Sequence, residues 1–207
     1  MKRAAILSTG AMLLSASVSH AQLPDLTYNR VGVSYVYSDV DEIDENSKGL
    51  FLNGSMELGD HVHVWGVVGR TWFDYILPAP GTQPVDVDFE AWLAALGAGV
   101  HHDLSDRVNA YARVGINSVD SKAEISLPFP VEGDSPDDSS VTSSFEVGIR
   151  FSTARHLELF AGVGHQDDAT SSHVGLEIPF IKAWAARVLA VVSDDSDGIG
   201  VAVVRRF

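Results

Sequence analysis

The chain has 207 residues, no cysteine, and 28 acidic against 14 basic residues, which gives a formal net charge of −14. This charge argues against nucleic acid as a partner, and the lack of cysteine excludes a fold held by disulfides. After residue 21 no stretch reaches the ~20 consecutive apolar residues of a transmembrane helix, so a membrane would have to be crossed by strands.

The N-terminus has the pattern of a secretory signal peptide. Lys2 and Arg3 precede a mostly apolar run over 4–18, and residues 19–21 read Ser-His-Ala, a small-x-small cleavage site. We expect export and cleavage after residue 21, so residues 1–21 are excluded from fold reasoning. Residues 22–207 are predicted to form one domain.

From residue 26 onward, apolar residues alternate with polar or small ones, which predicts β-strands. Within 61–73, Val62, Val64 and Val68 compete with Trp65, Val67 and Phe73 for the apolar face, so the register of that strand stays open. An eight-strand fold is the alternative if the pair beginning at residue 183 is misassigned. The pattern predicts ten strands, at about 26–38, 50–58, 61–73, 89–102, 108–118, 141–151, 156–165, 172–181, 183–193 and 198–207.

The connections between these strands alternate in length. The tight ones fall near 59–60, 103–107, 152–155 and 182, and the longer, acidic ones at 39–47, 74–88, 119–139, 166–171 and 194–197. This asymmetry is typical of an all-β, up-and-down antiparallel transmembrane β-barrel with short periplasmic turns, which would place both termini in the periplasm.

The second face of the strands carries charges and glycines, which suits the narrow lumen of a small barrel. The apolar face would then contact lipid, and aromatic residues near strand ends would form interface girdles. We expect the lumen charges to neutralise one another and fill the barrel, and we favour this interpretation over a selectivity filter. At most a narrow passage would then remain. The girdle candidates are Tyr35, Tyr37, Trp72, Phe73, Phe89, Trp92, Phe151, Phe180, Trp184 and Phe207. The lumen charge ladder is predicted to contain Arg30, Glu57, Arg113, Glu146, Arg150, Glu158 and Glu177, with Arg70, Glu90 and Arg187 as further members.

The last strand alternates Ile199, Val201 and Val203 and ends on Phe207, with Arg205 in place of an outward apolar residue. Together with the signal peptide and the meander, it resembles the outer-membrane β-barrel family of Gram-negative bacteria. In that family the terminal strand ending in Phe is recognised by the barrel-assembly machinery, so the resemblance implies that Phe207 is the insertion signal.

The stretches LTYNRVGVSYVYSD and GLFLNGSMEL are similar to small OmpA-like, porin-family barrels and to a subfamily described as outer-membrane quorum or diffusible-factor proteins. The resemblance implies an outer-membrane monomer without a cofactor. Its role would be structural, surface-interacting or that of a narrow porin-like channel, with outer-membrane lipids and lipopolysaccharide as partners.

Two acidic loops are weak candidates for divalent cations that bridge lipopolysaccharide phosphates, because clustered carboxylates suit Ca²⁺. A solvated loop is the interpretation that weighs more. The candidate ligands are Asp39, Asp41, Glu42 and Asp44 in one loop and Asp194, Asp195 and Asp197 in the other.

No nucleophile elbow, phosphate loop or dinucleotide fingerprint is present in the sequence, and we expect no enzyme activity. One alternative is a hydrolase at the rim that uses His165 with Asp167 or Asp168, or with Asp74 and Asp86. The tall rims of ten-stranded outer-membrane proteases argue against it, because this chain is short. A second alternative is a soluble periplasmic lipid-binding barrel.

Overall fold

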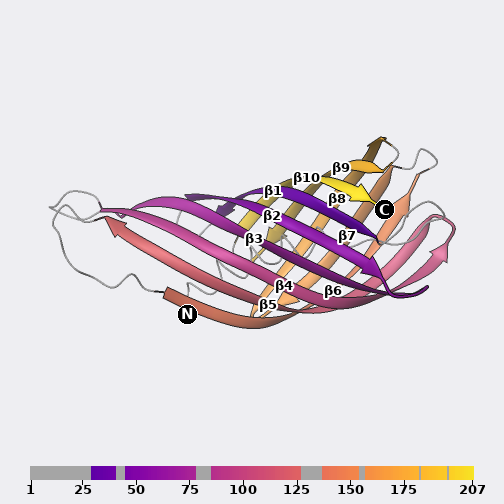
Figure 1. Ribbon diagram of the computed structural model, residues 1–207, viewed down its shortest axis with the longest axis horizontal. Coiled ribbons are helices and arrows are strands. Elements are labelled where there is room, and N and C mark those ends of the chain that lie inside the picture. The colour runs from indigo at the N-terminus through magenta and orange to yellow at the C-terminus, as the bar shows by residue number, and fades with distance from the viewer. Residues whose placement is uncertain are drawn as a thin grey trace.

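The computed structural model describes residues 29–40, 45–77, 85–126, 137–153, 157–181, 183–194 and 196–207. In these ranges the chain forms ten antiparallel strands that close into a barrel in which each strand pairs with its neighbours in sequence and β1 pairs with β10 (Figure 1). No helix of the described residues is long and apolar enough to cross a membrane. The strands are β1 Arg30–Val40, β2 Glu45–Glu57, β3 Val62–Leu77, β4 Val85–Ser105, β5 Val108–Ser126, β6 Asp137–Ser152, β7 Glu158–Gln166, β8 Ala169–Ile181, β9 Trp184–Ser193 and β10 Ser196–Arg206.

The predicted all-β, up-and-down barrel of ten strands is confirmed. The barrel closes where β1 pairs with β10 from Arg30 opposite Arg206 to Val40 opposite Ser196. Beyond the last strand, the amide of Phe207 donates a hydrogen bond to the carbonyl of Asn29 at 3.0 Å. The eight-strand alternative is wrong, because β9 pairs with both β8 and β10.

Side chains alternate between the outside and the lumen along every strand. On β1 the outward residues are Val33 and Tyr35, while Ser34 and Val36 are buried inside. The structure also resolves the register of β3: Val62, Val64 and Val68 face outward, so the indole of Trp65 enters the lumen. The outer surface is therefore predominantly apolar where the barrel would meet hydrocarbon.

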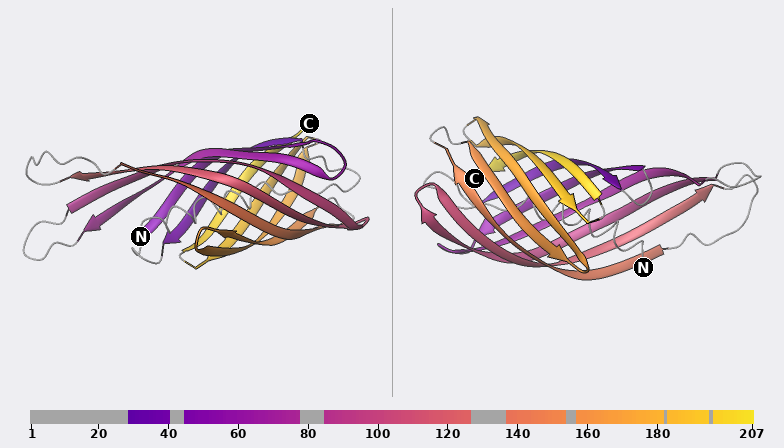
Figure 2. Two further views of the ribbon diagram at one scale, coloured as in Figure 1. Left: turned by 90° about the horizontal axis from the view of Figure 1, so that it is seen from below. Right: turned by 180° about the vertical axis from the view of Figure 1, so that it is seen from behind.

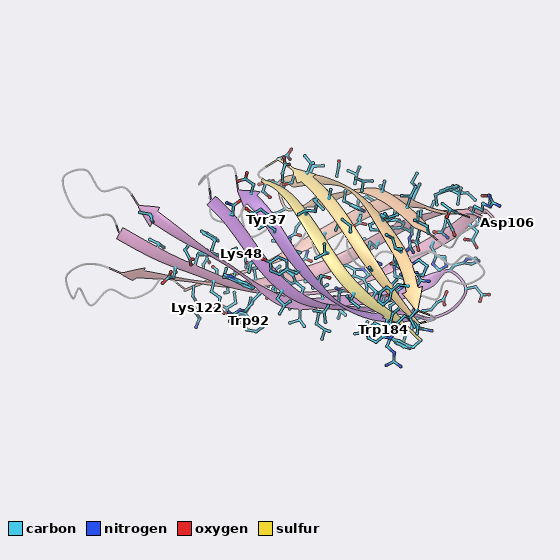
Figure 3. All side chains as sticks on the ribbon, turned by 90° about the horizontal axis from the view of Figure 1, so that it is seen from above. Tyr37, Lys48, Trp92, Asp106, Lys122 and Trp184 are labelled. Carbon is cyan, nitrogen blue, oxygen red and sulfur yellow. The ribbon has the colours of Figure 1, made fainter. Side chains whose placement is uncertain are left out.

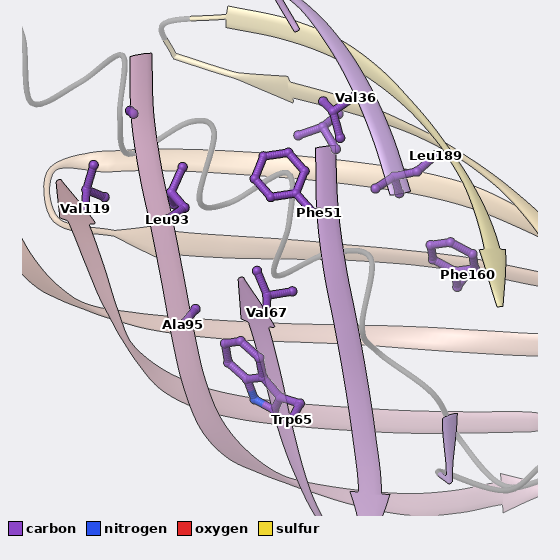
Figure 4. Packing of buried hydrophobic residues seen from close by; sticks show 11 residues of the cluster. Val36, Phe51, Trp65, Val67, Leu93, Ala95, Val119, Phe160 and Leu189 are labelled. Carbon is purple, nitrogen blue, oxygen red and sulfur yellow. The ribbon is translucent and has the colours of Figure 1, made fainter. Parts of the chain in front are cut away.

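Apolar side chains also fill part of the lumen, where 11 buried residues form one cluster (Figure 4). Trp65 is accommodated because Gly97 and Gly115 lie beside it on β4 and β5. A Cβ atom at Gly97 would lie 2.7 Å from the indole, and one at Gly115 would lie 2.5 Å from it. Glycine on the neighbouring strands thus creates the recess that holds the largest lumen side chain.

The rim opposite the short turns is uneven. Strands β3 to β6 have 16 to 21 residues, whereas β7 to β10 have 9 to 13, and the longer strands project as a wall beyond the shorter ones (Figure 2). The predicted connections 74–88 and 119–139 are therefore too long, because β3 and β4 stay paired as far as Leu77 with Val85, and β5 and β6 as far as Lys122 with Asp137.

The girdle prediction needs one correction. Tyr37 and Trp92 lie toward the projecting end and Trp184 toward the other, as an interface belt requires (Figure 3). Phe73 and Phe89 instead face the inner side of the wall, where their rings stack with centroids 4.6 Å apart. Each pairs with the other across β3 and β4, so both belong to the lumen face.

Candidate functional site

A buried carboxylate near the short-turn end of the lumen binds three arginines. Glu177 on β8 has an exposed fraction of 0% and accepts hydrogen bonds from Arg30 at 3.0 and 3.1 Å and from Nε of Arg187 at 3.2 Å. Arg206, the third arginine, donates a further charge-assisted bond to the same carboxylate. Because these arginines come from β1, β9 and β10, the cluster ties together the strands at which the barrel closes.

A second network crosses the lumen from β5 to β8. Glu146 on β6 pairs with Arg113 and accepts a hydrogen bond of 2.8 Å from the hydroxyl of Tyr111. The same hydroxyl lies 3.2 Å from Nε2 of His173 on β8. Tyr111 therefore reaches past two intervening strands and joins β5 to β8 inside the barrel.

The remaining ladder candidates also face the lumen. Arg150 on β6 forms a buried ion pair with Glu158 on β7. Glu57 ends β2 and is half-buried, and its backbone amide donates a hydrogen bond to Oδ1 of Asn29 at 3.3 Å. Every described member of the seven-residue ladder thus lies on the inner face, and six of the seven form three groups of ion pairs.

The predicted place of Arg70 and Glu90 in the lumen is wrong. They pair across β3 and β4 on the outer face, at 3.3 Å and with exposed fractions of 47% and 42%. Fixing the register of β3 from Trp65 places Arg70 outward. Its guanidinium also lies 5.3 Å from the ring centroid of Trp72.

The sequence analysis missed three members of the two lumen networks: Arg206, Tyr111 and His173. All three lie on the polar face by alternation, which is the signal that could have found them. Arg205, the unusual outward residue of the last strand, lies with its guanidinium 5.9 Å from the ring of Trp184.

The acidic loop candidates are only partly within the described residues, since Asp41, Glu42, Asp44 and Asp195 lie outside them. Asp39 and Asp197 occupy directly opposed positions on β1 and β10, and both are exposed. Asp194 accepts a hydrogen bond of 3.0 Å from the amide of Thr170. Within the described parts of the chain, no group of three or more potential ligands could hold a metal ion. The divalent-cation site stays a prediction.

The histidines do not assemble the proposed hydrolytic pair. His165 is exposed, and its Nδ1 lies 3.2 Å from the hydroxyl of Thr170, with no carboxylate bonded to it among the described residues. Four other histidines gather near the short turns, with ring centroids 6.0 to 6.2 Å apart: His61, His63, His101 and His102.

A closed antiparallel meander, apolar outside and charged inside, defines a transmembrane β-barrel. The family model described as outer membrane protein beta-barrel domain matches residues 6–207, so the chain belongs to this family. The prediction of an outer-membrane β-barrel is confirmed, whereas the finer resemblance to quorum or diffusible-factor proteins stays a prediction.

Solved structures show the same fold at low sequence identity. The translocator domain of autotransporter NalP from Neisseria meningitidis is similar at a TM-score of 0.58 and 12% identity, over 99% of this chain and 96% of that one. An outer membrane channel from Pseudomonas putida F1 is similar at a TM-score of 0.53 and 12% identity, over 92% of this chain and 100% of the other. No curated protein sequence matches this chain.

Proposed function

We propose that this outer-membrane barrel serves as a surface-interaction protein. We call the part of β3 to β6 that extends beyond the other strands the projecting wall. The closed barrel anchors this wall in the membrane and holds it outside the cell. It acts without catalysis and without a cofactor. The exported chain would lose residues 1–21 and leave both termini in the periplasm.

The observation that carries this proposal is a change of chemistry on the outer face of the wall. On β5 the outward residues Val114 and Ile116 are followed by Ser118 and then Asp120, all of them exposed. On the neighbouring β4, which runs in the opposite direction, Glu90 lies above Trp92 toward the projecting end. Charged side chains on a lipid face are unfavourable, so the hydrocarbon boundary falls below these residues and the upper wall lies in water.

The contacts across the lumen favour an anchoring role and argue against a wide channel. Tyr111 spans from β5 to β8, and the ion pair of Arg30 and Glu177 spans from β8 to β1. Near Arg187 a void of about 10 Å³ is lined by Ser34, Leu189 and other residues of β1, β9 and β10. Breaking such buried pairs to admit a solute would be unfavourable.

Orientation is tested by labelling introduced cysteines, which the natural chain lacks. Asp120→Cys places a thiol on the outer face of the wall, and Asp106→Cys places a matched exposed thiol in the short turn between β4 and β5. We expect a membrane-impermeant maleimide to label Asp120→Cys on intact cells and Asp106→Cys only after the outer membrane is permeabilised. The reverse pattern would overturn the proposal.

The narrow channel is the second candidate function, and planar-bilayer recording separates the two. We expect no discrete conductance from the natural protein, and an increase for Tyr111→Ala but not for Tyr37→Ala, whose side chain faces outward. Discrete openings of the natural protein would replace the anchoring role by a porin-like one.

The partners of the barrel itself are proposed on general grounds. Lys48, Arg70 and Lys122 face outward at the projecting end, where phosphates of lipopolysaccharide would meet them. Phe207 would present the terminal strand to the barrel-assembly machinery. We propose a monomer, because the described strands close into a barrel and none of them is left unpaired within the membrane band.

A further inference from the structure

The first part of β6 has a neighbour on one side only. β5 pairs with β6 as far as Lys122 opposite Asp137, whereas β7 pairs with it only from Ser152 to Ser144. Among the described residues, nothing pairs with the β7 side of 137–143. We call residues 139–143 of this segment the open edge.

The direction of the backbone groups along the open edge follows from two hydrogen bonds at the other end of β6. The amide of Ser152 donates to the carbonyl of Arg107, on the β5 side, and the amide of Thr153 donates to the carbonyl of Leu157, on the β7 side. Residues of an antiparallel strand direct their backbone groups alternately to the two neighbours, and the pairing of β5 with β6 shows no register shift. The odd-numbered residues of β6 therefore face the β7 side.

On the open edge these residues are Ser139, Val141 and Ser143. Their N–H and C=O groups point to the side where β7 has already ended. Val141 is 71% exposed, the highest exposed fraction among the large apolar side chains of the described residues. The edge thus offers three residues of unused ladder beside an uncovered apolar side chain.

The open edge also lacks the usual protection against pairing. Its sequence SSVTS contains no Lys, Arg or Pro, and it carries no bulge. Exposed edges without such devices pair readily with other chains. The uppermost pair of β6 and β7, Ser144 with Gln166, lies just above outward-facing Phe145, so the open edge lies on the aqueous side of the apolar band.

The charges around the open edge select its occupant. Asp138 faces the inner side of the wall, Asp120 lies opposite Ser139 on the outer side, and Asp167 and Asp168 form the turn beside the lower end. All four are exposed. A strand that carries basic side chains would find complementary charge on both faces.

We propose that the open edge of β6 binds an extended, basic segment of a partner polypeptide by strand addition. Main-chain hydrogen bonds to Ser139, Val141 and Ser143 provide affinity, and carboxylates on both faces select for basic side chains. This inference rests on the proposed surface role. A second copy of this chain is a poor occupant, because it would bring another acidic edge of a chain with net charge −14.

The test uses the purified full-length barrel in detergent and two labelled ten-residue peptides, one alternating Lys and Thr and the other alternating Glu and Thr. We expect a saturable rise in fluorescence anisotropy with the Lys peptide and none with the Glu peptide. Val141→Pro removes one edge N–H without removing a bond to β5, because proline is tolerated at an edge position that faces away from the ladder. We expect it to weaken binding about tenfold or more.

Val141→Thr is the matched control, since it changes the side chain and keeps the N–H, and it should bind as the natural protein does. Ser139→Pro provides a second removal of an edge N–H, and the heat-dependent gel shift of folded barrels shows that each variant is assembled. The proposal is overturned if both proline variants bind normally, if both peptides bind equally, or if the barrel pairs with itself instead. Because this assay needs no orientation in cells, its failure leaves the maleimide and conductance results intact.

Discussion

Replacing Glu177 with Gln removes a buried carboxylate that bonds to three arginines while keeping the size of the side chain. In the native lumen, Glu177 accepts hydrogen bonds from Arg30 at 3.0 Å and from Nε of Arg187 at 3.2 Å, and it also pairs with Arg206. The neutral amide of Gln cannot balance the positive charges of the three arginines. Its NH₂ group also cannot accept hydrogen bonds from a guanidinium group.

The size of the effect follows from burial. Glu177 is fully buried, and the side chains of Arg30 and Arg187 are each 2% exposed, so solvent screens the resulting repulsion poorly. Removing one partner from a buried ion pair costs about 3–5 kcal/mol, or a factor of roughly 10²–10⁴ in the unfolding equilibrium. Glu177→Gln should therefore lose stability of this order.

The assay is urea unfolding of the barrel in lipid vesicles, followed by tryptophan fluorescence. Glu90→Gln is the matched control, because Glu90 makes an ion pair with Arg70 on the exposed outer face. That pair should contribute only about 0–1 kcal/mol. If Glu177→Gln shifts the unfolding midpoint no more than Glu90→Gln does, the lumen cluster does not stabilise the barrel and the reasoning fails.

Three further changes probe other parts of the molecule. Gly97→Ala adds a Cβ that would meet a backbone carbonyl at 2.1 Å and the buried indole at 2.7 Å, so we expect a loss of about 1–3 kcal/mol in urea unfolding. The change Gly54→Ala, whose nearest contact would be 3.3 Å, should lose less, and equal losses would refute the recess. Tyr111→Phe removes the hydroxyl contacts of 2.8 Å with Glu146 and 3.2 Å with His173 and should cost about 1–3 kcal/mol of stability. Tyr37→Phe, on the outer face, should be neutral. Equal stability of the two variants would show that the contacts of Tyr111 do not stabilise the barrel. Deleting Phe207 should reduce the heat-shifted, folded form in cell membranes, and unchanged assembly would remove its role as insertion signal.

The fold could be predicted because alternation and membrane chemistry reinforce one another between the two boundaries of the bilayer. Val114 and Ile116 face lipid, so their neighbours Arg113 and Asn117 must face the lumen. The upper strands could not be predicted in this way. Beyond Ile116 on β5 the outward residues Ser118 and Asp120 are polar, whereas the inward Val119 is apolar and buried, so the apolar-out, polar-in alternation is lost although the pairing with neighbouring strands continues.

The partners within the lumen were also beyond prediction. Alternation places Glu177 inside, but its contact with Arg30 joins residues 147 positions apart in sequence and depends on how β1 meets β10. The error at Arg70 has a similar origin. Two sets of apolar residues alternate along β3, and the sequence does not show which set faces the lumen. The packing of Trp65 against Gly97 decides it.

The step in the rim between β6 and β7 is consistent with the solvent on each side of the boundary. Within hydrocarbon, an unpaired backbone group costs several kcal/mol, so β6 must be paired on both sides there. That pairing holds from Ser152 up to Ser144, next to Phe145 on the lipid face. Above it, water can satisfy the backbone of Val141, and β7 can end without this penalty. The open edge of β6 can therefore exist only on the part of the wall that leaves the membrane, which is where a partner strand in solution could reach it.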